Sequence, residues 1–393
     1  MRHHQEEELK PDDMTEVIVS LRGWHVPLAH AELCALLPNM TIQATSSKRW
    51  YSVSGDMTLN DVVKALSIAA NVEAIFDAGV VIQWDGSYEN VKSLLKTSIS
   101  KYSDTTVSTR SWKHGPKIDN FSLSEMARHV GGVLTSQHCT INFQAPEQTY
   151  GLCSDAQSQS ILCGWLVGHA LESFGAERRQ ATERPFFKPV SLDPKLARTA
   201  VNLACGPISD AFVLDPMTGT GGFMIEASLS GRNGIAVDQN SAMVEGAKAN
   251  LRWAHGDEQS PSCIILRGDA TYLEHTIPDE IKGNIGGVVL DPPYGRNSQG
   301  TLGHVDLLQK TLFSVNSVIH HNAEMVLILP ITPMEIFAHS GFSEEDIVPL
   351  HGSFEHMKQM LEHTHWMIRG MFVERVHKSL SRLVLHAKFS PRD

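Results

Sequence analysis

Residues 213–223 read Val-Leu-Asp-Pro-Met-Thr-Gly-Thr-Gly-Gly-Phe, in which an apolar strand runs into a glycine turn that opens a helix. In such a turn glycine lets the backbone approach a ligand closely, and the N–H groups at the start of the helix point outward. Many α/β proteins that bind nucleotides carry a turn of this kind. The stretch therefore indicates an α/β ligand-binding domain and leaves the ligand open.

Regular alternation of strands and helices surrounds this turn from residue 193 onward. Short apolar runs separated by helical patterns are typical of a mostly parallel, doubly wound sheet. The expected strands cover residues 211–215, 234–238, 263–267, 287–290 and 325–329, with a late pair at 371–374 and 383–388, and the expected helices cover 194–204, 223–229, 242–254 and 307–320.

Acidic residues follow the next two strands. Asp238 stands nineteen residues after Gly219, a spacing that suits a carboxylate accepting from both hydroxyls of an adenosine ribose. Asp269 follows the strand at 263–267, where it could accept from an adenine amino group. Each acid alone could equally be a helix N-cap. Because open α/β sheets bind ligands at the carboxyl ends of consecutive strands, the set as a whole favours a ligand site.

A fourth strand end carries residues suited to chemistry. Residues 288–295 read Val-Val-Leu-Asp-Pro-Pro-Tyr-Gly, and two adjacent prolines predict a stiff loop rather than a strand. Such a loop can hold the Asp291 carboxylate toward an exocyclic amino group while Tyr294 stacks on the base. Accepting hydrogen bonds from a conjugated amine keeps electron density on its nitrogen as it attacks an electrophilic methyl group. A plain turn is the alternative, and the order of these residues favours methyl transfer.

Composition excludes several classes of protein. The chain has 393 residues, 42% of them hydrophobic and 20% charged, which is typical of a globular protein with two or three domains. No apolar run approaches the roughly 20 residues of a membrane span, and the polar N-terminus does not resemble a secretory signal. We therefore expect a cytoplasmic protein without membrane contact.

The cysteines and histidines do not form a metal-binding pattern. None of the six cysteines stands in a C-x-x-C pair, so we expect reduced thiols. His363 and His365 stand two residues apart, and side chains at i,i+2 do not share a helix face. We expect no metal site.

The formal net charge of −11 argues against a nucleic-acid partner when it is averaged over the chain. However, six basic residues lie between positions 92 and 117, against the single acid Asp104. A second basic cluster consists of Arg178, Arg179 and Arg184. Such clusters can be a phosphate footprint, and a solvated face is the alternative.

The first half of the chain lacks a glycine-rich turn and mixes strands with helices. We expect a disordered tail at residues 1–14, a small α+β module at 15–86, a second α+β unit at 87–176, a charged linker at 177–191 and the α/β domain at 192–393.

The order of glycine turn, Asp238, Asp269 and Asp291-Pro292-Pro293-Tyr294 resembles class I S-adenosylmethionine-dependent amino-methyltransferases. The tail Gly295-Arg296 and the stretches Arg-Pro-Phe-Phe-Lys-Pro at 184–189 and Leu-Asp-Pro-Lys-Leu-Ala-Arg at 192–198 resemble, more narrowly, the THUMP-containing tRNA guanosine-N2 methyltransferases of the archaeal guanosine-10 type. The resemblance covers residues 184–388 by motif and 15–176 by arrangement. It implies a ferredoxin-like module at 15–86, a THUMP domain at 87–176 and a Rossmann-like methyltransferase domain at 192–393.

The resemblance also implies a cofactor, a substrate and residue roles. S-adenosylmethionine would be the cofactor, without a metal, and tRNA the partner. The implied cofactor-binding residues are Asp215, Thr218, Gly219 and Gly221 around the methionine part, Asp238 and Gln239 at the ribose, Asp269 and Ala270 at the adenine, and the stretch from Phe187 to Leu196 over the methionine end. Thr218 stands where relatives often have cysteine. The implied catalytic residues are Asp291, Pro292, Pro293 and Tyr294, and the implied RNA-binding residues are Lys92, Lys96, Lys101, Arg110, Lys113, Lys117 and Arg296.

Several alternatives stay open. A nicotinamide-dependent oxidoreductase would also use a glycine turn, but Met224 stands where its third glycine belongs. DNA adenine and protein glutamine methyltransferases share the proline loop without the long N-terminal half, and an RNA-binding protein without activity is the non-enzyme alternative. Within the resembling family, guanosine-6 and rRNA enzymes are the closest competitors. One or two methylations, the oligomeric state and the need for an accessory subunit are left open.

Overall fold

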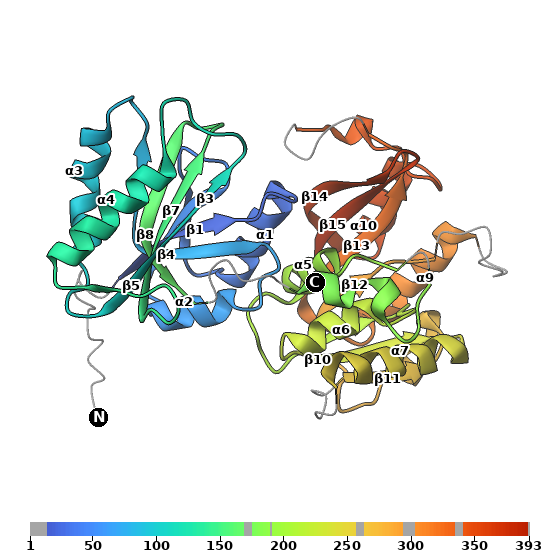
Figure 1. Ribbon diagram of the computed structural model, residues 1–393. Helices are drawn as coiled ribbons and strands as arrows, with labels where there is room; N and C mark the ends of the chain where they lie inside the picture. Colours follow the sequence, from blue (N-terminus) through green and yellow to red (C-terminus); the bar gives the residue numbers. More distant parts are fainter. Residues whose placement is uncertain are drawn as a thin grey trace, which may run out of the picture. The chain divides into compact units, whose positions relative to one another are not determined.

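The computed structural model describes residues 14–168, 175–188, 191–256, 263–293, 303–334 and 341–391 (Figure 1). The expected disordered tail at 1–14 lies outside these residues except for Met14. The chain forms two compact units. Unit 1 comprises Met1–Val26, Leu37–Ser67 and Val72–Glu172, and unit 2 comprises Pro27–Leu36, Ile68–Asn71 and Ser173–Asp393.

Unit 1 is built on one sheet whose strand order is β2-β3-β1-β4-β8-β7-β5-β6. Its strands are β1 (Thr15–Leu21), β2 (Thr41–Ala44), β3 (Trp50–Gly55), β4 (Val72–Gln83), β5 (Thr106–His114), β6 (Thr140–Ile141), β7 (Gln148–Asp155) and β8 (Ser160–Val167). Its helices are α2 (Leu59–Leu66), α3 (Tyr88–Ile99) and α4 (Leu123–Ser136). The pairing of β4 with β8 joins the segments expected as two modules into one continuous sheet.

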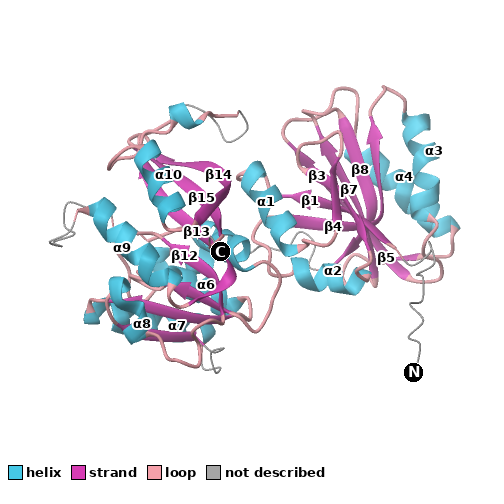
Figure 2. Cartoon of the chain, turned by 180° about the vertical axis from the view of Figure 1, so that it is seen from behind, coloured by secondary structure: helices cyan, strands magenta, loops and turns pink. Residues whose placement is uncertain are grey.

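Helices α3 and α4 cover one face of this sheet (Figure 2). Helix α4 shows why: Met126, Val130 and Leu134 recur at four-residue spacing and are all buried. Ser122 begins the helix by accepting a hydrogen bond from the backbone N–H of Glu125 at 3.3 Å. The apolar spacing and the cap together fix both the start of α4 and the face it buries.

The long strand β4 bends where it pairs with β8. A bulge separates Asp77 from Val80, and a Cβ added at Gly164 on β8 would lie 2.9 Å from the Cα of Gly79. The two backbones approach too closely for a side chain, which requires glycine at position 164.

Unit 2 contains the expected doubly wound sheet, with strand order β11-β10-β9-β12-β13-β15-β14. Its strands are β9 (Phe212–Asp215), β10 (Asn233–Asp238), β11 (Cys263–Arg267), β12 (Ile285–Leu290), β13 (Ile319–Ile331), β14 (Trp366–His377) and β15 (Leu380–Phe389). Strands β9 to β13 pair in parallel, and β15 and β14 are antiparallel additions. The predicted Rossmann-like arrangement of this half is confirmed.

Helices lie on both faces of this sheet. They are α1 (Val26–Leu36), α5 (Pro194–Cys205), α6 (Gly222–Leu229), α7 (Ser241–His255), α8 (Leu273–Thr276), α9 (His304–Asn316) and α10 (Phe354–His363), with short 3₁₀ turns at Ala176–Arg179, Ala181–Glu183, Ala270–Tyr272 and Glu344–Asp346. Helices α5, α6 and α7 pack on one face, which we call the α5 face, and α8, α9 and α10 pack on the other. No helix in the described ranges is long and apolar enough to cross a membrane.

Helix α1 lies between β1 and β2 in the sequence but packs within unit 2. Its buried Glu32 accepts hydrogen bonds from the backbone N–H groups of Ala70 at 2.9 Å and Asn71 at 3.0 Å, and from the Asn202 amide at 2.7 Å. These contacts fasten α1 and residues 68–71 to α5. The expected boundary at residue 86 does not account for this packing.

Residues 177–188, which belong to the expected linker, also pack within unit 2. Arg179 forms an ion pair with the fully buried Glu226 of α6 at 2.8 Å, and Arg198 of α5 pairs with the other oxygen at 3.0 Å. A buried carboxylate held between two guanidinium groups is costly to break. The described part of this segment is therefore structural, in contrast to the linker expected from its charge and prolines.

Candidate active site

The acidic residues of the predicted site lie at one edge of the unit 2 sheet. Asp215 and Asp238 end β9 and β10, Asp291 follows β12 directly, and Asp269 follows β11 after Gly268. Because these strands are parallel neighbours, their carboxyl ends meet at the same edge. The structure thus brings together the four acids that the sequence placed at strand ends.

Asp215 and Asp291 also project from the same face. Val213 and Val289 belong to the core under α5, and side chains two residues apart on a strand share a face. Asp215 and Asp291 therefore extend from the α5 face at the end of adjacent strands. Their charges interact, since Asp291 contributes to raising the pKa of Asp215.

The glycine turn between β9 and α6 is held by backbone contacts. Gly219 and Gly221 have φ angles of +52° and +81°, a region that favours glycine. The N–H of Gly219 donates to Asp238 Oδ2 at 2.9 Å, which ties the turn to the end of β10. A Cβ added at Gly219 would meet no described heavy atom within 4 Å, so this backbone is open on the side where a ligand can approach.

Asp215 presents an unsatisfied oxygen at the base of this turn. Its Oδ1 accepts from the Met217 N–H at 3.2 Å, whereas Oδ2 is buried without a hydrogen-bond partner among the described residues. The Thr218 hydroxyl is also buried and makes no hydrogen bond of ordinary geometry among the described residues. Burial raises the pKa of Asp215 to about 8, and the nearby Thr218 hydroxyl and Met217 N–H oppose this shift. A cationic amine would supply the donor that Oδ2 lacks at hydrogen-bonding distance.

We predict that Asp215→Asn flattens the pH dependence of stability of the ligand-free protein. The folded pKa near 8 lies above the unfolded value of 3.8, so this group's stabilising contribution is full below about pH 4 and is lost as pH rises toward 8. Wild type should therefore lose stability relative to Asp215→Asn across this window, by on the order of a few kcal/mol. Thermal melts at several pH values measure the difference, and parallel curves would contradict it.

Asp238 is half-buried, and both of its oxygens accept backbone hydrogen bonds. Besides Gly219, the N–H of Asn240 donates to Oδ1 at 2.8 Å. Burial raises the pKa of Asp238, and the two N–H groups oppose that shift. Gln239 is exposed beside it, and its carbonyl accepts from Arg267 Nε at 3.3 Å. Asp238 thus orients the glycine turn, and its contact with a ribose stays a prediction.

Asp269 acts as a helix N-cap in this structure. Its Oδ1 accepts from the Thr271 N–H at 2.9 Å and from the Thr271 hydroxyl at 2.8 Å, at the start of the 3₁₀ turn Ala270–Tyr272. Asp269 is exposed and Ala270 is buried. The N-cap alternative is therefore realised, and the contact of Asp269 and Ala270 with an adenine stays a prediction.

Asp291 lies at the start of the proline loop. Asp291 is partly buried, Pro292 is buried and Pro293 is exposed, while Tyr294 and Arg296 lie outside the described residues. Burial raises the pKa of Asp291 to about 7, the positive charge of Arg382 opposes the shift and Glu374 adds to it. The pKa of this carboxyl group therefore lies near neutrality, and the positive charge of Arg382 acts on it.

The segment before α5 lies over α7 and the glycine turn. The Asn250 side chain accepts from the Phe186 N–H at 2.9 Å and donates to the carbonyls of Phe186 at 2.6 Å and Thr220 at 2.9 Å. A Cβ at Gly246 would lie 2.1 Å from the Phe186 ring, so the ring rests on the α7 backbone. Asn250 and Gly246 are positioning residues that the sequence analysis missed, because an asparagine and a glycine inside a helix carry no distinctive signal.

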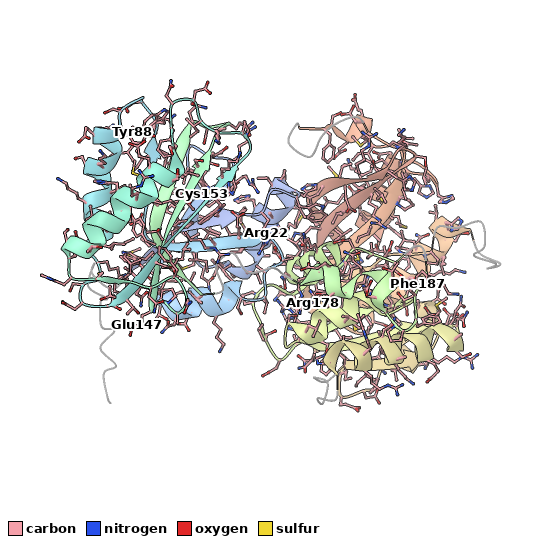
Figure 3. All side chains as sticks on the ribbon, in the orientation of Figure 1. Arg22, Tyr88, Glu147, Cys153, Arg178 and Phe187 are labelled. Carbon is pink, nitrogen blue, oxygen red and sulfur yellow. The ribbon has the colours of Figure 1, made fainter. Side chains whose placement is uncertain are left out.

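The two ends of the predicted methionine-side stretch differ in exposure. Phe187 is 49% exposed and is available to a ligand (Figure 3). Leu196 is fully buried in the core of the α5 face, where it packs with Ala200 and Val213. The structure therefore gives Leu196 a role in the core of this face.

The predicted RNA-binding residues of unit 1 do not form one surface. Lys92 and Lys96 lie on α3, and Lys92 pairs with Glu89 at 2.9 Å. Lys101 forms an ion pair with Asp77. Arg110, Lys113 and Lys117 are exposed, and Arg110 and Lys113 are three residues apart on β5, so they extend from opposite faces of the sheet.

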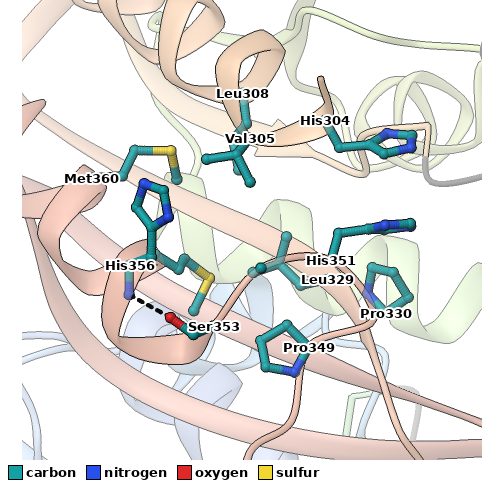
Figure 4. A pocket seen from close by; sticks show the side chains of 12 residues that line it. His304, Val305, Leu308, Leu329, Pro330, Pro349, His351, Ser353, His356 and Met360 are labelled. Carbon is teal, nitrogen blue, oxygen red and sulfur yellow. Dashed lines mark hydrogen bonds between the residues drawn. The ribbon is translucent and has the colours of Figure 1, made fainter. Parts of the chain in front are cut away.

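A pocket lies on the opposite face from α5, between α9, the end of β13 and α10 (Figure 4). Leu308, Leu329 and Met360 form apolar walls, and the rings of His304 and His351 lie 4.2 Å apart between centroids at its rim. No carboxylate lines it, and no three metal-ligating side chains are grouped anywhere in the described ranges. The acidic edge, rather than this pocket, carries the groups suited to amine chemistry.

Comparison with known proteins supports a methyltransferase at this edge. Residues 181–339 match the family model described as UPF0020, RMKL-like, methyltransferase domain. The chain is 26% identical over 366 residues to a tRNA (guanine(10)-N2)-dimethyltransferase of Pyrococcus abyssi, covering 90% of this chain and 97% of the relative. It is 25% identical over 331 residues to the protein of the same name from Methanocaldococcus jannaschii, covering 79% and 90%.

Among solved structures, the crystal structure of TrmN from Thermus thermophilus is 16% identical, with a TM-score of 0.47 over 95% of this chain and all of that one. The family match spans the glycine turn, the acidic strand ends and the proline loop. The α/β half of this chain is thus similar to a methyltransferase domain, and most of the chain is similar in sequence to archaeal tRNA (guanine(10)-N2)-dimethyltransferases.

Proposed function

We propose that this protein transfers methyl groups from S-adenosylmethionine to the exocyclic N2 amine of a guanosine in tRNA. The proposed target is guanosine-10, and the products are N2-methylguanosine and N2,N2-dimethylguanosine. The observation that carries the proposal is Asp291, a carboxylate on a stiff proline loop beside the buried, unsatisfied Asp215. Similarity to relatives of that name over 97% and 90% of their length supports the substrate. A tRNA substrate also implies a cytoplasmic protein.

The residues at the sheet edge fit S-adenosylmethionine, whose sulfonium supplies an electrophilic methyl group when the cofactor is bound. The orphaned Oδ2 of Asp215 can accept from its ammonium group, and the open backbone of Gly219 leaves room for its methionine part. Asp238 would accept from the ribose and Asp269 with Ala270 would contact the adenine. Thr218, Gly221, Gln239 and Phe187 complete the proposed cofactor-binding set.

On the substrate side, Asp291 would accept hydrogen bonds from the guanine N2 amine. This interaction orients the nitrogen lone pair and stabilises the positive charge that develops on nitrogen in the transition state, and the Asp291 carboxylate can take the proton that the methylated nitrogen loses. Pro292 and Pro293 stiffen the loop that carries Asp291, and we retain Tyr294 as the residue that stacks on the flipped base. Arg296, in the same loop, would contact the RNA backbone.

The N-terminal half would supply tRNA recognition. We propose that residues 15–86 form a ferredoxin-like module and residues 87–176 a THUMP domain, which share the continuous sheet of unit 1. The exposed Lys96, Arg110, Lys113 and Lys117, together with Lys92 and Lys101, would meet phosphates of the tRNA. Their distribution over both faces of the sheet suggests contacts with more than one stretch of the RNA backbone.

We predict that the triple variant Lys96→Gln, Arg110→Gln, Lys113→Gln weakens tRNA binding and flattens its salt dependence. Each lost phosphate contact should reduce the slope of log affinity against log salt by roughly 0.7–0.9. Cofactor affinity should not change, because the cofactor residues lie in unit 2. A control with Lys48, Lys64 and Lys282 changed to Gln removes the same charge. Equal slopes in the two triple variants would show that the residues between 92 and 117 do not contact tRNA.

Substitution of the target nucleotide tests the proposed reaction. An unmodified tRNA transcript should accept methyl groups, whereas a transcript with inosine at position 10, which lacks the N2 amine, should accept none there. Methylation of the inosine transcript at the same level would overturn the assignment of position and atom. Methylation of adenines instead would favour the amino-methyltransferase alternative.

A further inference from the structure

Arg382 and Glu374 form a largely buried ion pair between β14 and β15. Arg382 on β15 donates from Nη1 to Glu374 Oε2 on β14 at 3.2 Å, and the two residues stand opposite each other in the antiparallel register. Their side chains are only 15% and 12% exposed. Removing two charges from water is costly, so a pair at this depth is weak evidence of a purely stabilising role.

The strand register brings this pair to the site of Asp291. Arg382 stands opposite Pro330 near the carboxyl end of β13, and Leu290, which precedes Asp291, stands opposite Leu327 on the same strand. The pair therefore lies toward the same edge of the sheet as Asp291. Arg382 is two strands from Asp291, about 10 Å across the sheet at ordinary strand spacing, and Glu374 is one strand further.

Side-chain alternation places the three residues on the same face as well. Val384 on β15 and Val289 on β12 both belong to the core of the α5 face. Arg382 lies two residues from Val384, and Asp291 lies two residues from Val289, so both side chains extend from the α5 face. Glu374 stands opposite Arg382 in the strand register and therefore extends from the same face. The electrostatic interaction of Asp291 with both Arg382 and Glu374 agrees with this placement.

Asp291 and Arg382 together complement one edge of guanine. A carboxylate accepts hydrogen bonds and a guanidinium has five N–H donors, of which the described structure commits one, to Glu374. The edge of guanine that carries the N2 donor also carries the O6 acceptor, whereas adenine has an amino group in place of O6. With Asp291 accepting from N2, an N–H group of Arg382 could donate to O6. An amino group at that position is itself a donor, so it could not accept this hydrogen bond.

We propose that Arg382, oriented by Glu374, donates to O6 of the target guanine while Asp291 accepts from N2, and that this arginine makes the site selective for guanine over a purine with a 6-amino group. The inference rests on the proposed function and adds a specificity-determining residue to it. Glu374 acts through Arg382 as a positioning residue. A site built to hydrogen-bond a substrate group rejects an analogue without that group strongly.

The test compares two tRNA transcripts, one with guanine and one with 2,6-diaminopurine at the target position. Diaminopurine keeps the 2-amino nucleophile and carries an amino group in place of O6. Wild type should prefer guanine in kcat/KM by at least about a hundredfold. Arg382→Met should lower the rate on guanine and reduce the preference to less than about tenfold, and Glu374→Gln should give an intermediate ratio.

A matched control is Arg375→Met, which removes an exposed arginine of β14 and should leave the preference at the wild-type value. Thermal melting and cofactor-binding calorimetry on every variant separate loss of folding from loss of selectivity.

Each outcome separates the inference from the proposed function. If wild type methylates guanine but shows an equal rate on diaminopurine, Arg382 does not recognise O6, and this result needs no variant to fold. If Arg382→Met prefers guanine over diaminopurine as strongly as wild type does, the inference is also overturned. If wild type methylates neither transcript while binding cofactor, the proposed function fails instead.

Discussion

Replacing Asp291 by alanine should lower methyl transfer to tRNA by two or more orders of magnitude and leave cofactor affinity nearly unchanged. Asp291 is assigned to the amine that attacks, so its loss removes an interaction made in the transition state. The glycine turn is held by Asp238, whose Oδ2 accepts from the Gly219 N–H, so the described contacts of the turn do not depend on Asp291. Single-turnover transfer of a labelled methyl group and calorimetry of cofactor binding measure the two effects separately.

Asp291→Asn is the matched control for this prediction. The amide keeps the shape and one acceptor oxygen but loses the negative charge, so its rate should fall between those of wild type and Asp291→Ala. If turnover survives in Asp291→Ala, or if cofactor binding is lost together with activity, the role of Asp291 is misassigned.

Asp238→Ala should show the opposite pattern. Its cofactor affinity should fall about tenfold to a hundredfold, whereas turnover of the cofactor-bound protein should change less. A charge-assisted contact with the ribose is worth roughly 1.5–3 kcal/mol. The structure adds a second reason, since Asp238 also holds the N–H of Gly219 and therefore the shape of the glycine turn.

Asp269→Ala provides the comparison, because Asp269 is exposed and caps a 3₁₀ turn. Calorimetry should give it a smaller loss of affinity than Asp238→Ala. If the dissociation constant for the cofactor is unchanged in Asp238→Ala, Asp238 does not bind the ribose and only stabilises the turn.

The sheet of unit 2 and its acidic edge could be predicted from the sequence because each of the strands β9 to β12 is a short apolar run with an acid at or just after its end. Parallel topology then places those ends together, which is why Asp215, Asp238 and Asp291 converge as expected. The role of Asp269 as an N-cap was weighed as an alternative, and sequence alone could not decide it, because the same residue at the same place serves either purpose.

Other features depend on contacts that sequence spacing does not show. The strands β7 and β8 are buried on both faces and show no apolar-polar alternation, so their sequences do not distinguish them from helical segments and do not predict the continuous sheet of unit 1. Helix α1 packs in unit 2 because Glu32 finds its partners on residues 70–71 and on Asn202, far along the chain.

The pair Arg382 and Glu374 was missed for a related reason. The last two strands are longer than expected, Trp366–His377 and Leu380–Phe389, and Arg382 fell just outside the segment expected as a strand. Opposite charges facing each other across a hairpin are the signal that could have identified the pair. That signal becomes visible only when the register is known.

The central claim is methyl transfer to N2 of a guanosine in tRNA at the edge that holds Asp291. Nucleoside mass spectrometry with fragment mapping, on an unmodified tRNA transcript incubated with the purified protein and S-adenosylmethionine, tests it most directly. We predict N2-methylguanosine and N2,N2-dimethylguanosine at position 10, and neither in the Asp291→Ala protein. Methyl groups found only on adenine or at ring nitrogens, or no modified nucleoside from a protein that binds the cofactor and the tRNA, would contradict the claim.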